Sequence, residues 1–122
     1  MYSKGKQYRF EEIISQMKEI YIKEGCEALL NDDEWCMYSN EDDFNLNSIC
    51  YIDDYPDIDD ETYEEVYPKF ITINALSLVY TDEQLQNIII SALSQNVELT
   101  NEDLMKAILY YDEYDCFFDF SK

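Results

Sequence analysis

The chain has 122 residues, with 28 Asp and Glu against 8 Lys and Arg and no histidine, which gives a formal net charge of −20. Hydrophobic residues make up 47% of the chain and aromatic residues 16%, so it can bury a core and is not a disordered acidic tail. The charge predicts no direct contact with nucleic acid, because affinity for phosphate needs clustered Lys and Arg. The missing histidine removes the commonest general base and a common zinc ligand.

The N-terminal segment is basic but lacks the apolar stretch of a secretory signal. The longest apolar runs, such as residues 88–90, are far shorter than the ~20 residues that cross a bilayer. We therefore expect a cytoplasmic protein that does not enter a membrane. None of the cysteines forms a Cys-x-x-Cys pair, which favours free thiols over a zinc site or disulfides; they are Cys26, Cys36, Cys50 and Cys116.

The first predicted element is a helix over residues 10–21, where apolar residues recur at three- and four-residue spacing. Gly25 is the expected end of this helix. Residues 35–38 and 49–52 are short runs of aromatic, sulfur-containing and β-branched residues. They predict an antiparallel hairpin with a long polar loop.

The next segment, residues 53–65, is dense in Asp and Glu and is expected to be a loop or a loosely helical turn. A further strand is predicted over residues 70–73, after Pro68, with an extension through residues 78–80.

Two capping boxes predict the starts of two more helices, at Thr81 and at Thr100. The aromatic tail, residues 116–120, is expected to form a final strand. The sequence therefore predicts one α+β domain over residues 1–122, with a mostly antiparallel sheet of about four strands packed against about three helices.

The abundant carboxylates suggest three kinds of chemistry, and none fits well. A glycosidase needs two acids held across a cleft, whereas these acids repel one another towards solvent. Residues 53–64 have the length of an EF-hand loop, but Ile58 stands at the glycine position and Pro56 where the backbone must turn freely. Weak, incidental binding of divalent cations stays open. Since phosphate loops, nucleophile elbows and zinc-protease motifs are missing too, we expect no enzyme activity, no catalytic residue, no cofactor and no metal site.

The most informative feature is an acidic run interspersed with tyrosines. Residues 24–68 contain no Lys or Arg, although charge this dense destabilises a compact state. Solubility is one explanation. The other is a basic protein partner, whose cationic cleft the carboxylates would cover as phosphates do, while Tyr55, Tyr63 and Tyr67 serve as aromatic anchors. The predicted partner-binding residues are Asp53, Asp54, Tyr55, Asp57, Asp59, Asp60, Glu61, Tyr63, Glu64 and Glu65.

These features together resemble the small acidic immunity proteins of bacterial polymorphic and contact-dependent toxin systems. The chain also resembles a loosely defined bacterial family in three motifs along residues 34–119: Trp35, the strand and Asp-rich turn 49–54, and Tyr-Tyr-x-x-x-Asp-x-Phe over 110–117. The immunity resemblance implies a cytoplasmic inhibitor that binds one cognate toxin domain, often a nuclease, without catalytic residues or a cofactor.

Two hypotheses both take the acidic run as the partner-binding surface. The first is an immunity protein that neutralises a nuclease toxin by occluding its cationic cleft. In a variant of it, the tail aromatics or the face of the first helix bind beside the toxin's active site. The second is a phage-encoded nucleic-acid mimic that inhibits a host restriction or CRISPR complex. An unrelated small enzyme is a third alternative, which an apolar pocket holding a carboxylate of raised pKa would favour.

Overall fold

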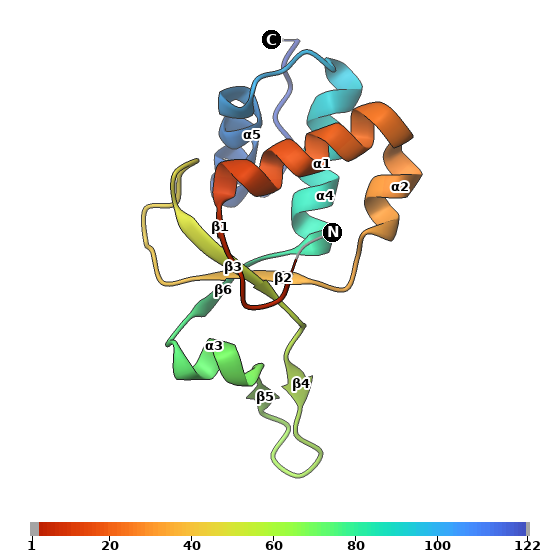
Figure 1. Ribbon diagram of the computed structural model, residues 1–122. Coiled ribbons are helices and arrows are strands. Elements are labelled where there is room, and N and C mark those ends of the chain that lie inside the picture. Colours follow the sequence, from red (N-terminus) through yellow and green to blue (C-terminus); the bar gives the residue numbers. More distant parts are fainter. Residues whose placement is uncertain (1–2, 122) are drawn as a thin grey trace.

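A four-stranded sheet organises the computed structural model, which describes residues 3–121 (Figure 1). The strand order is β1-β3-β2-β6, and every neighbouring pair is antiparallel. β2 and β3 form the predicted hairpin with its long connecting loop. The strands are β1 (Gln7–Arg9), β2 (Cys36–Ser39), β3 (Ile49–Asp53) and β6 (Ser77–Thr81).

One face of the sheet is covered by helices (Figure 1). Because side chains alternate along a strand, Met37, Cys50 and Ile52 all point to this face. There they join the apolar stripes of the helices, such as Ile13 and Ile89, in the main buried core. The covering helices are α1 (Phe10–Glu24), α2 (Cys26–Asn31), α4 (Asp82–Gln95) and α5 (Asn101–Tyr114).

The predicted capping boxes are present at the starts of α4 and α5. The Thr81 hydroxyl accepts from the Gln84 N–H at 3.2 Å, and the Gln84 side chain accepts from the Thr81 N–H at 2.9 Å. Thr100 and Asp103 make the same reciprocal pair at 3.2 and 3.0 Å. Both boxes satisfy backbone donors that the first turn leaves without partners.

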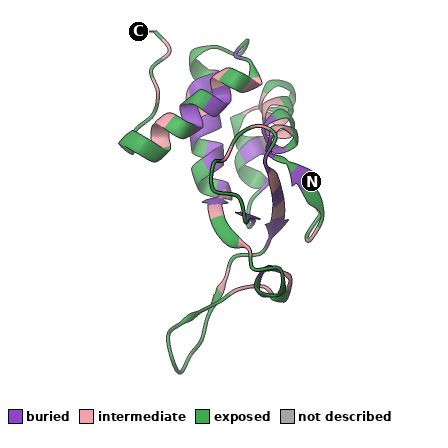
Figure 2. Cartoon of the chain, turned by 90° about the vertical axis from the view of Figure 1, so that its left-hand side faces the viewer, coloured by how far each residue is buried: buried purple, intermediate pink, exposed green. Residues whose placement is uncertain are grey.

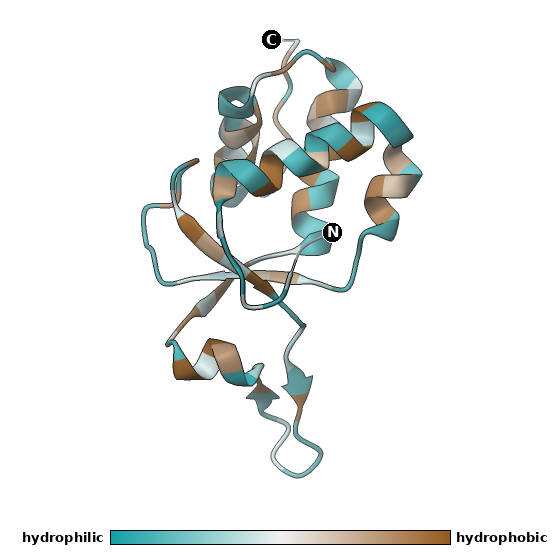
Figure 3. Ribbon diagram, in the orientation of Figure 1, coloured by the Kyte–Doolittle hydropathy of each residue, from teal (hydrophilic) through white to brown (hydrophobic). Residues whose placement is uncertain are grey.

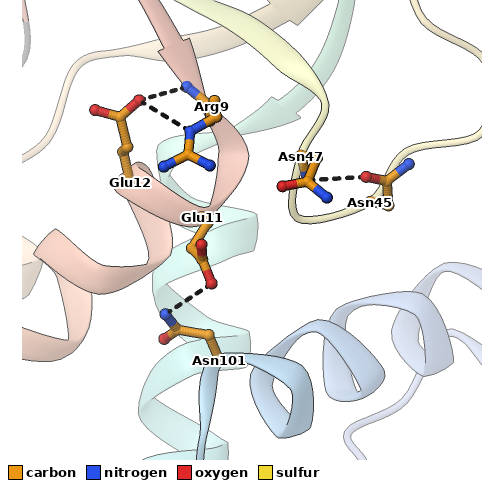
Figure 4. Close-up of polar contacts among 6 residues, drawn as sticks. All are labelled: Arg9, Glu11, Glu12, Asn45, Asn47 and Asn101. Carbon is orange, nitrogen blue, oxygen red and sulfur yellow. Dashed lines mark hydrogen bonds and ion pairs between the residues drawn. The ribbon is translucent and has the colours of Figure 1, made fainter.

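α1 begins with a different arrangement (Figure 4). A carboxylate oxygen of Glu12 accepts from the Arg9 N–H at 2.9 Å and lies 3.9 Å from Arg9 Nε. On the same turn, Glu11 accepts from the Asn101 side chain at 3.5 Å, and Asn101 also donates to Ser15 at 2.9 Å. These contacts join the starts of α1 and α5.

The opposite face of the sheet carries α3 (Lys69–Ile73). Ile71 is buried there against Cys36 and Tyr38, and the Phe70 ring lies 5.4 Å from the Tyr51 ring. The predicted strand over residues 70–73 is therefore wrong. A strand would turn Phe70 and Ile71 to opposite sides, whereas a helical turn lets both contact the sheet.

The predicted final strand, residues 116–120, is also wrong, because this tail is irregular. Its rings pack on helix α5, with Phe118 5.1 Å from Tyr110 and Phe117 5.3 Å from Tyr111. The Gln95 side chain donates to the Phe118 carbonyl at 2.9 Å and accepts from the Phe120 N–H at 2.8 Å. One side chain thus provides the backbone partners that a neighbouring strand would have supplied.

The sequence did not indicate β1 or α2, and it treated residues 53–65 as a loop. That segment contains the paired strands β4 (Asp57–Ile58) and β5 (Glu65–Val66), a second sheet separate from the first. The overall class is as predicted: a small single α+β domain whose main sheet has four antiparallel strands. Three of its helices, α1, α4 and α5, are the predicted ones.

Candidate partner-binding surface

Residues 57–66, which we call the acidic finger, extend from the sheet away from the helical layer (Figure 1). In β4 and β5, Asp57 lies opposite Val66 and Ile58 opposite Glu65. Since opposite residues share a face, each face of the finger combines one carboxylate with one aliphatic side chain. Every residue of the finger is exposed (Figure 2), and the finger is mostly hydrophilic (Figure 3). It offers charge and apolar contact together.

The turn of the finger is organised by the carboxylate of Asp59. Its Oδ1 accepts from the N–H groups of Glu61 at 2.8 Å and Thr62 at 3.0 Å. The Asp59 backbone also accepts from the Tyr63 N–H at 2.8 Å and donates to the Glu64 carbonyl at 2.9 Å. Hydrogen bonds from the Thr62 and Glu61 N–H groups hold the pKa of Asp59 below its ordinary value. Asp59 therefore shapes the finger rather than offering a free charge.

Tyr63 stands at the end of this turn and is 80% exposed. Its backbone has a φ of 59°, in the left-handed region that bulky residues rarely adopt. A large aromatic ring held out in solvent on an unfavourable backbone is the arrangement expected of a residue kept for contact with a partner.

Not all of the ten predicted partner-binding residues reach the surface. Nine are exposed, but Asp53 is only 7% exposed, inside β3 opposite Cys36. Its Oδ1 accepts from the Asp54 N–H at 2.7 Å. Placing Asp53 at the interface was therefore wrong, because the sheet buries it. Asp54 is exposed but pairs with Lys4 at 2.7 Å, which partly neutralises it.

Two of the three predicted aromatic anchors instead attach the finger to the body. The Tyr55 hydroxyl donates to Asp82, at the start of α4. The Tyr67 ring packs edge-on against Tyr38 with centroids 6.2 Å apart, and its hydroxyl donates to Glu65 at 2.6 Å. Burial and then the Asp82 hydrogen bond raise the pKa of Tyr55, while the Glu65 hydrogen bond raises that of Tyr67. Of the three predicted anchors, Tyr63 is the one that remains mostly in solvent.

The alternative binding surface on the first helix is limited to its solvent-facing side, where Ile22 is 54% exposed. The apolar face of α1 is buried in the core, including Phe10, Ile14 and Met17. The tail aromatics are partly accessible, with Tyr114 57% exposed and Phe117 47% exposed.

A buried polar network that the sequence did not indicate lies between α4 and the segments that precede β2 and the finger. Asp82 is buried and accepts from the Glu34 N–H at 2.6 Å as well as from Tyr55. Buried Gln86, one turn further along α4, donates to the carbonyls of Leu29 at 2.9 Å and Asp32 at 2.7 Å. Both polar residues fall on the apolar side of a helix, which was the signal available in the sequence.

An apolar pocket that holds a carboxylate of raised pKa would favour an enzyme, and Asp32 comes closest to that description. Burial is the largest cause that raises its pKa above the ordinary value, and Asp33 and Asp82 add to it, while the N-terminal ammonium acts in the opposite direction. Asp32 lines a groove between α1 and α2 in which Ile20 and Ala28 are the aliphatic lining residues and the others are polar or charged, rather than a deep apolar pocket.

The cysteines are free, with Cys26 and Cys116 exposed and Cys36 and Cys50 buried. Burial raises the pKa of Cys36 to about 11 and that of Cys50 to about 12, so neither is a thiolate near neutral pH. Within residues 3–121, no cluster of three or more acidic or cysteine side chains is arranged to hold a metal ion. In the same part of the chain, no helix has the length and apolarity needed to cross a bilayer.

Residues 14–120 match the family described as a domain of unknown function, DUF7716, and the chain belongs to that family. The match runs from α1 to the aromatic tail and so includes the acidic finger. No curated protein and no solved structure matches the chain.

Proposed function

We propose that this protein is a cytoplasmic immunity protein that neutralises a cognate toxin domain, a nuclease, by placing the acidic finger in its cationic cleft. The observation that carries the proposal is the finger itself. Asp57, Asp60 and Glu61 are exposed on it with no basic residue nearby in the sequence, and Tyr63 extends from its tip.

The inhibition follows from charge and shape. Carboxylates along the finger would pair with the Arg and Lys side chains that hold nucleic-acid phosphates, so inhibitor and substrate would compete for the same groups. The Tyr63 ring would stack on an Arg guanidinium, and Ile58 and Val66, 56% and 51% exposed, would add apolar contact. A net charge of −20 would also speed the encounter.

The test compares two variants of equal charge. The finger variant carries Lys in place of Asp57, Asp60, Glu61 and Glu64, and leaves Asp59 because it orders the turn. The control carries Lys at exposed acids outside the finger, namely Asp42, Asp43, Glu98 and Glu113. Each set of four reversals changes the net charge by eight, from −20 to −12.

Wild-type protein, finger variant and control are used to capture partners from the native host, and the retained protein is purified. We expect a basic nuclease domain that wild type and control inhibit. The finger variant should associate with it about 10- to 100-fold more slowly at low salt, with a smaller difference at high salt. Equal inhibition by both variants would show that the finger is not the binding surface. Capture of a restriction or CRISPR complex would instead identify a phage-encoded nucleic-acid mimic.

A further inference from the structure

Residues of α1 and α2 line a groove in the helical layer. Figure 1 shows these two helices on the other side of the sheet from the acidic finger. The groove has a volume of about 430 Å³, which is within the range of small-molecule sites. Aliphatic Ile20 and Ala28 form part of its wall, and polar residues including Glu24, Asn31 and Asp32 form the rest.

Asp32 in this groove has an unsatisfied buried carboxylate oxygen. The residue follows the last turn of α2 and is 9% exposed, and its Oδ1 has no hydrogen-bond partner among residues 3–121. Its carbonyl accepts from Trp35 Nε1 and from Gln86 Nε2, each at 2.7 Å, so the residue is firmly held. Buried polar atoms in native proteins nearly always have a partner, so this one points to a missing donor.

The cation already in the groove does not supply that donor. Lys23 lines the same groove, but its ammonium donates to Glu19 at 2.6 Å on the exposed side of α1. Among the charged groups that act on Asp32, the N-terminal ammonium lowers its pKa, while Asp33 and Asp82 raise it. A positive group entering the groove would meet the carboxylates of Asp32 and Glu24 on its wall.

We propose that this groove binds a primary alkylammonium group, with Asp32 as its anionic partner and Ile20 and Ala28 beside the alkyl chain. The side-chain oxygens of Asn31 and Glu24 are available to the remaining N–H donors. An ammonium fits better than a guanidinium, because the lining contains no aromatic ring on which a guanidinium could stack. The same chemistry is present in a lysine side chain of another protein and in a free diamine.

The experiment titrates the full chain with three probes at 150 mM salt: cadaverine, N-acetyl-lysine methylamide and N-ethylguanidinium. Carboxyl NMR shifts report binding at each Asp and Glu. Asp32→Asn is paired with Asp33→Asn, which removes the same charge from the exposed neighbouring residue. A third variant, Ala28→Leu, narrows the groove without changing charge, so the proposal stays testable if Asp32→Asn folds poorly.

We expect saturable binding of an ammonium probe, with the largest shift at Asp32. Asp32→Asn should weaken it about tenfold or more, as expected for loss of a charged hydrogen-bond partner, and Ala28→Leu should weaken it too. Asp33→Asn should change it less than about twofold because exposed charges are screened. Tighter binding of the capped lysine would indicate a protein side chain, and of cadaverine a free diamine.

Three results would overturn the proposal. Equal losses in the two Asp variants would mean diffuse attraction to an acidic chain. Tighter binding of N-ethylguanidinium would contradict the ammonium assignment. The absence of a saturable shift at Asp32 with either ammonium probe would show that the groove does not bind this group. None of these results depends on the role of the acidic finger.

Discussion

The hydroxyl of Tyr55 donates a hydrogen bond to the carboxylate of Asp82, 27 positions further along the chain. Tyr55 stands just before the acidic finger, and buried Asp82 is the first residue of α4. Asp82 also accepts from the N–H groups of Glu34 at 2.6 Å and Glu83 at 2.7 Å. One buried carboxylate therefore connects the finger, the segment before β2 and the start of a core helix.

Replacing Tyr55 by Phe should remove this connection and little else. Asp82 keeps its two backbone donors and Tyr55 is 41% exposed, so we expect the free energy of unfolding to fall by about 1–2 kcal/mol, near the lower end of the range for a hydrogen bond to a charged group. Urea denaturation measures the change. Tyr63→Phe is the matched control, because Tyr63 is 80% exposed, and it should change stability by less than about 0.5 kcal/mol. Equal effects of the two variants would contradict a structural role for the Tyr55 hydroxyl.

Asp59→Ala should loosen the turn of the finger. The variant removes the acceptor of the Glu61 and Thr62 N–H groups, so hydrogen exchange of those two amides should accelerate. Asp60→Ala, at the neighbouring exposed acid, should leave both rates unchanged. If both variants exchange alike, the Asp59 carboxylate does not organise the turn.

Acid should have the same effect on the turn as Asp59→Ala. The pKa of Asp59 is lowered in the folded state by hydrogen bonds from the Thr62 and Glu61 N–H groups. A carboxyl with a lowered pKa stabilises the folded form above its ordinary pKa of about 3.9, and this contribution is lost as pH falls through the folded value. Amide protection in the turn should therefore decrease below about pH 4 in wild type and be insensitive to pH in Asp59→Ala.

Tyr63→Gly should make the protein more stable than Tyr63→Ala does. The φ of 59° at this position suits glycine and strains residues that carry a Cβ, so the difference should be about 0.5–1 kcal/mol in favour of Gly. Thermal unfolding of the two variants measures it. If the ring is a partner-binding anchor, both variants should lose affinity for the partner equally. Retention of full affinity by either would remove Tyr63 from the proposed interface.

The four thiols should separate into two classes when treated with an aromatic disulfide reagent at pH 8. Exposed Cys26 and Cys116 should react quickly, while buried Cys36 and Cys50 should react only after the protein unfolds. The double variant Cys26→Ser, Cys116→Ser should abolish the fast phase. Fast reaction of three or more thiols would contradict the burial of β2 and β3.

Alkaline pH should destabilise the fold because it ionises the two buried thiols, Cys36 and Cys50. Burial raises the folded pKa of Cys36 to about 11 and of Cys50 to about 12. A thiol whose pKa is raised on folding stabilises the protein below its ordinary pKa of about 8.5, and the contribution is lost as pH rises through the folded value. The free energy of unfolding measured by urea denaturation should therefore decline from about pH 9 to pH 12. The two thiols should cause no change in it near neutral pH.

The elements predicted correctly are those whose signals are local. α4 and α5 start where Thr81 and Thr100 meet partners three residues on, and α1 repeats its apolar residues along one face. The capping boxes and the apolar repeat both involve residues within one or two helical turns of each other. The β2–β3 hairpin was recognised because both of its strands enter the core and are rich in apolar and aromatic residues.

The elements predicted wrongly are apolar runs whose partner lies elsewhere in the chain. Residues 70–73 and the aromatic tail both have strand-like composition, yet one folds as α3 and the other packs irregularly on α5. Composition indicated that these runs would pack against the rest of the chain, and the position of the sheet and of Gln95 decided how they do so. Ile73 and Phe117 remain 68% and 47% exposed.

The carboxylates are the clearest case in which the local sequence does not determine the role of a residue. Composition alone establishes a chain of net charge −20 that can bury a core, and the order of the residues adds the long helices and the run without Lys or Arg. It does not distinguish Asp53 inside the sheet, Asp59 within its own turn and Asp60 facing solvent. Asp53 is buried by strands distant in the sequence, and Asp59 accepts from N–H groups two and three residues further on once the turn has formed. Asp60 stays exposed. Tertiary structure therefore decided which negative charges are free to meet a partner.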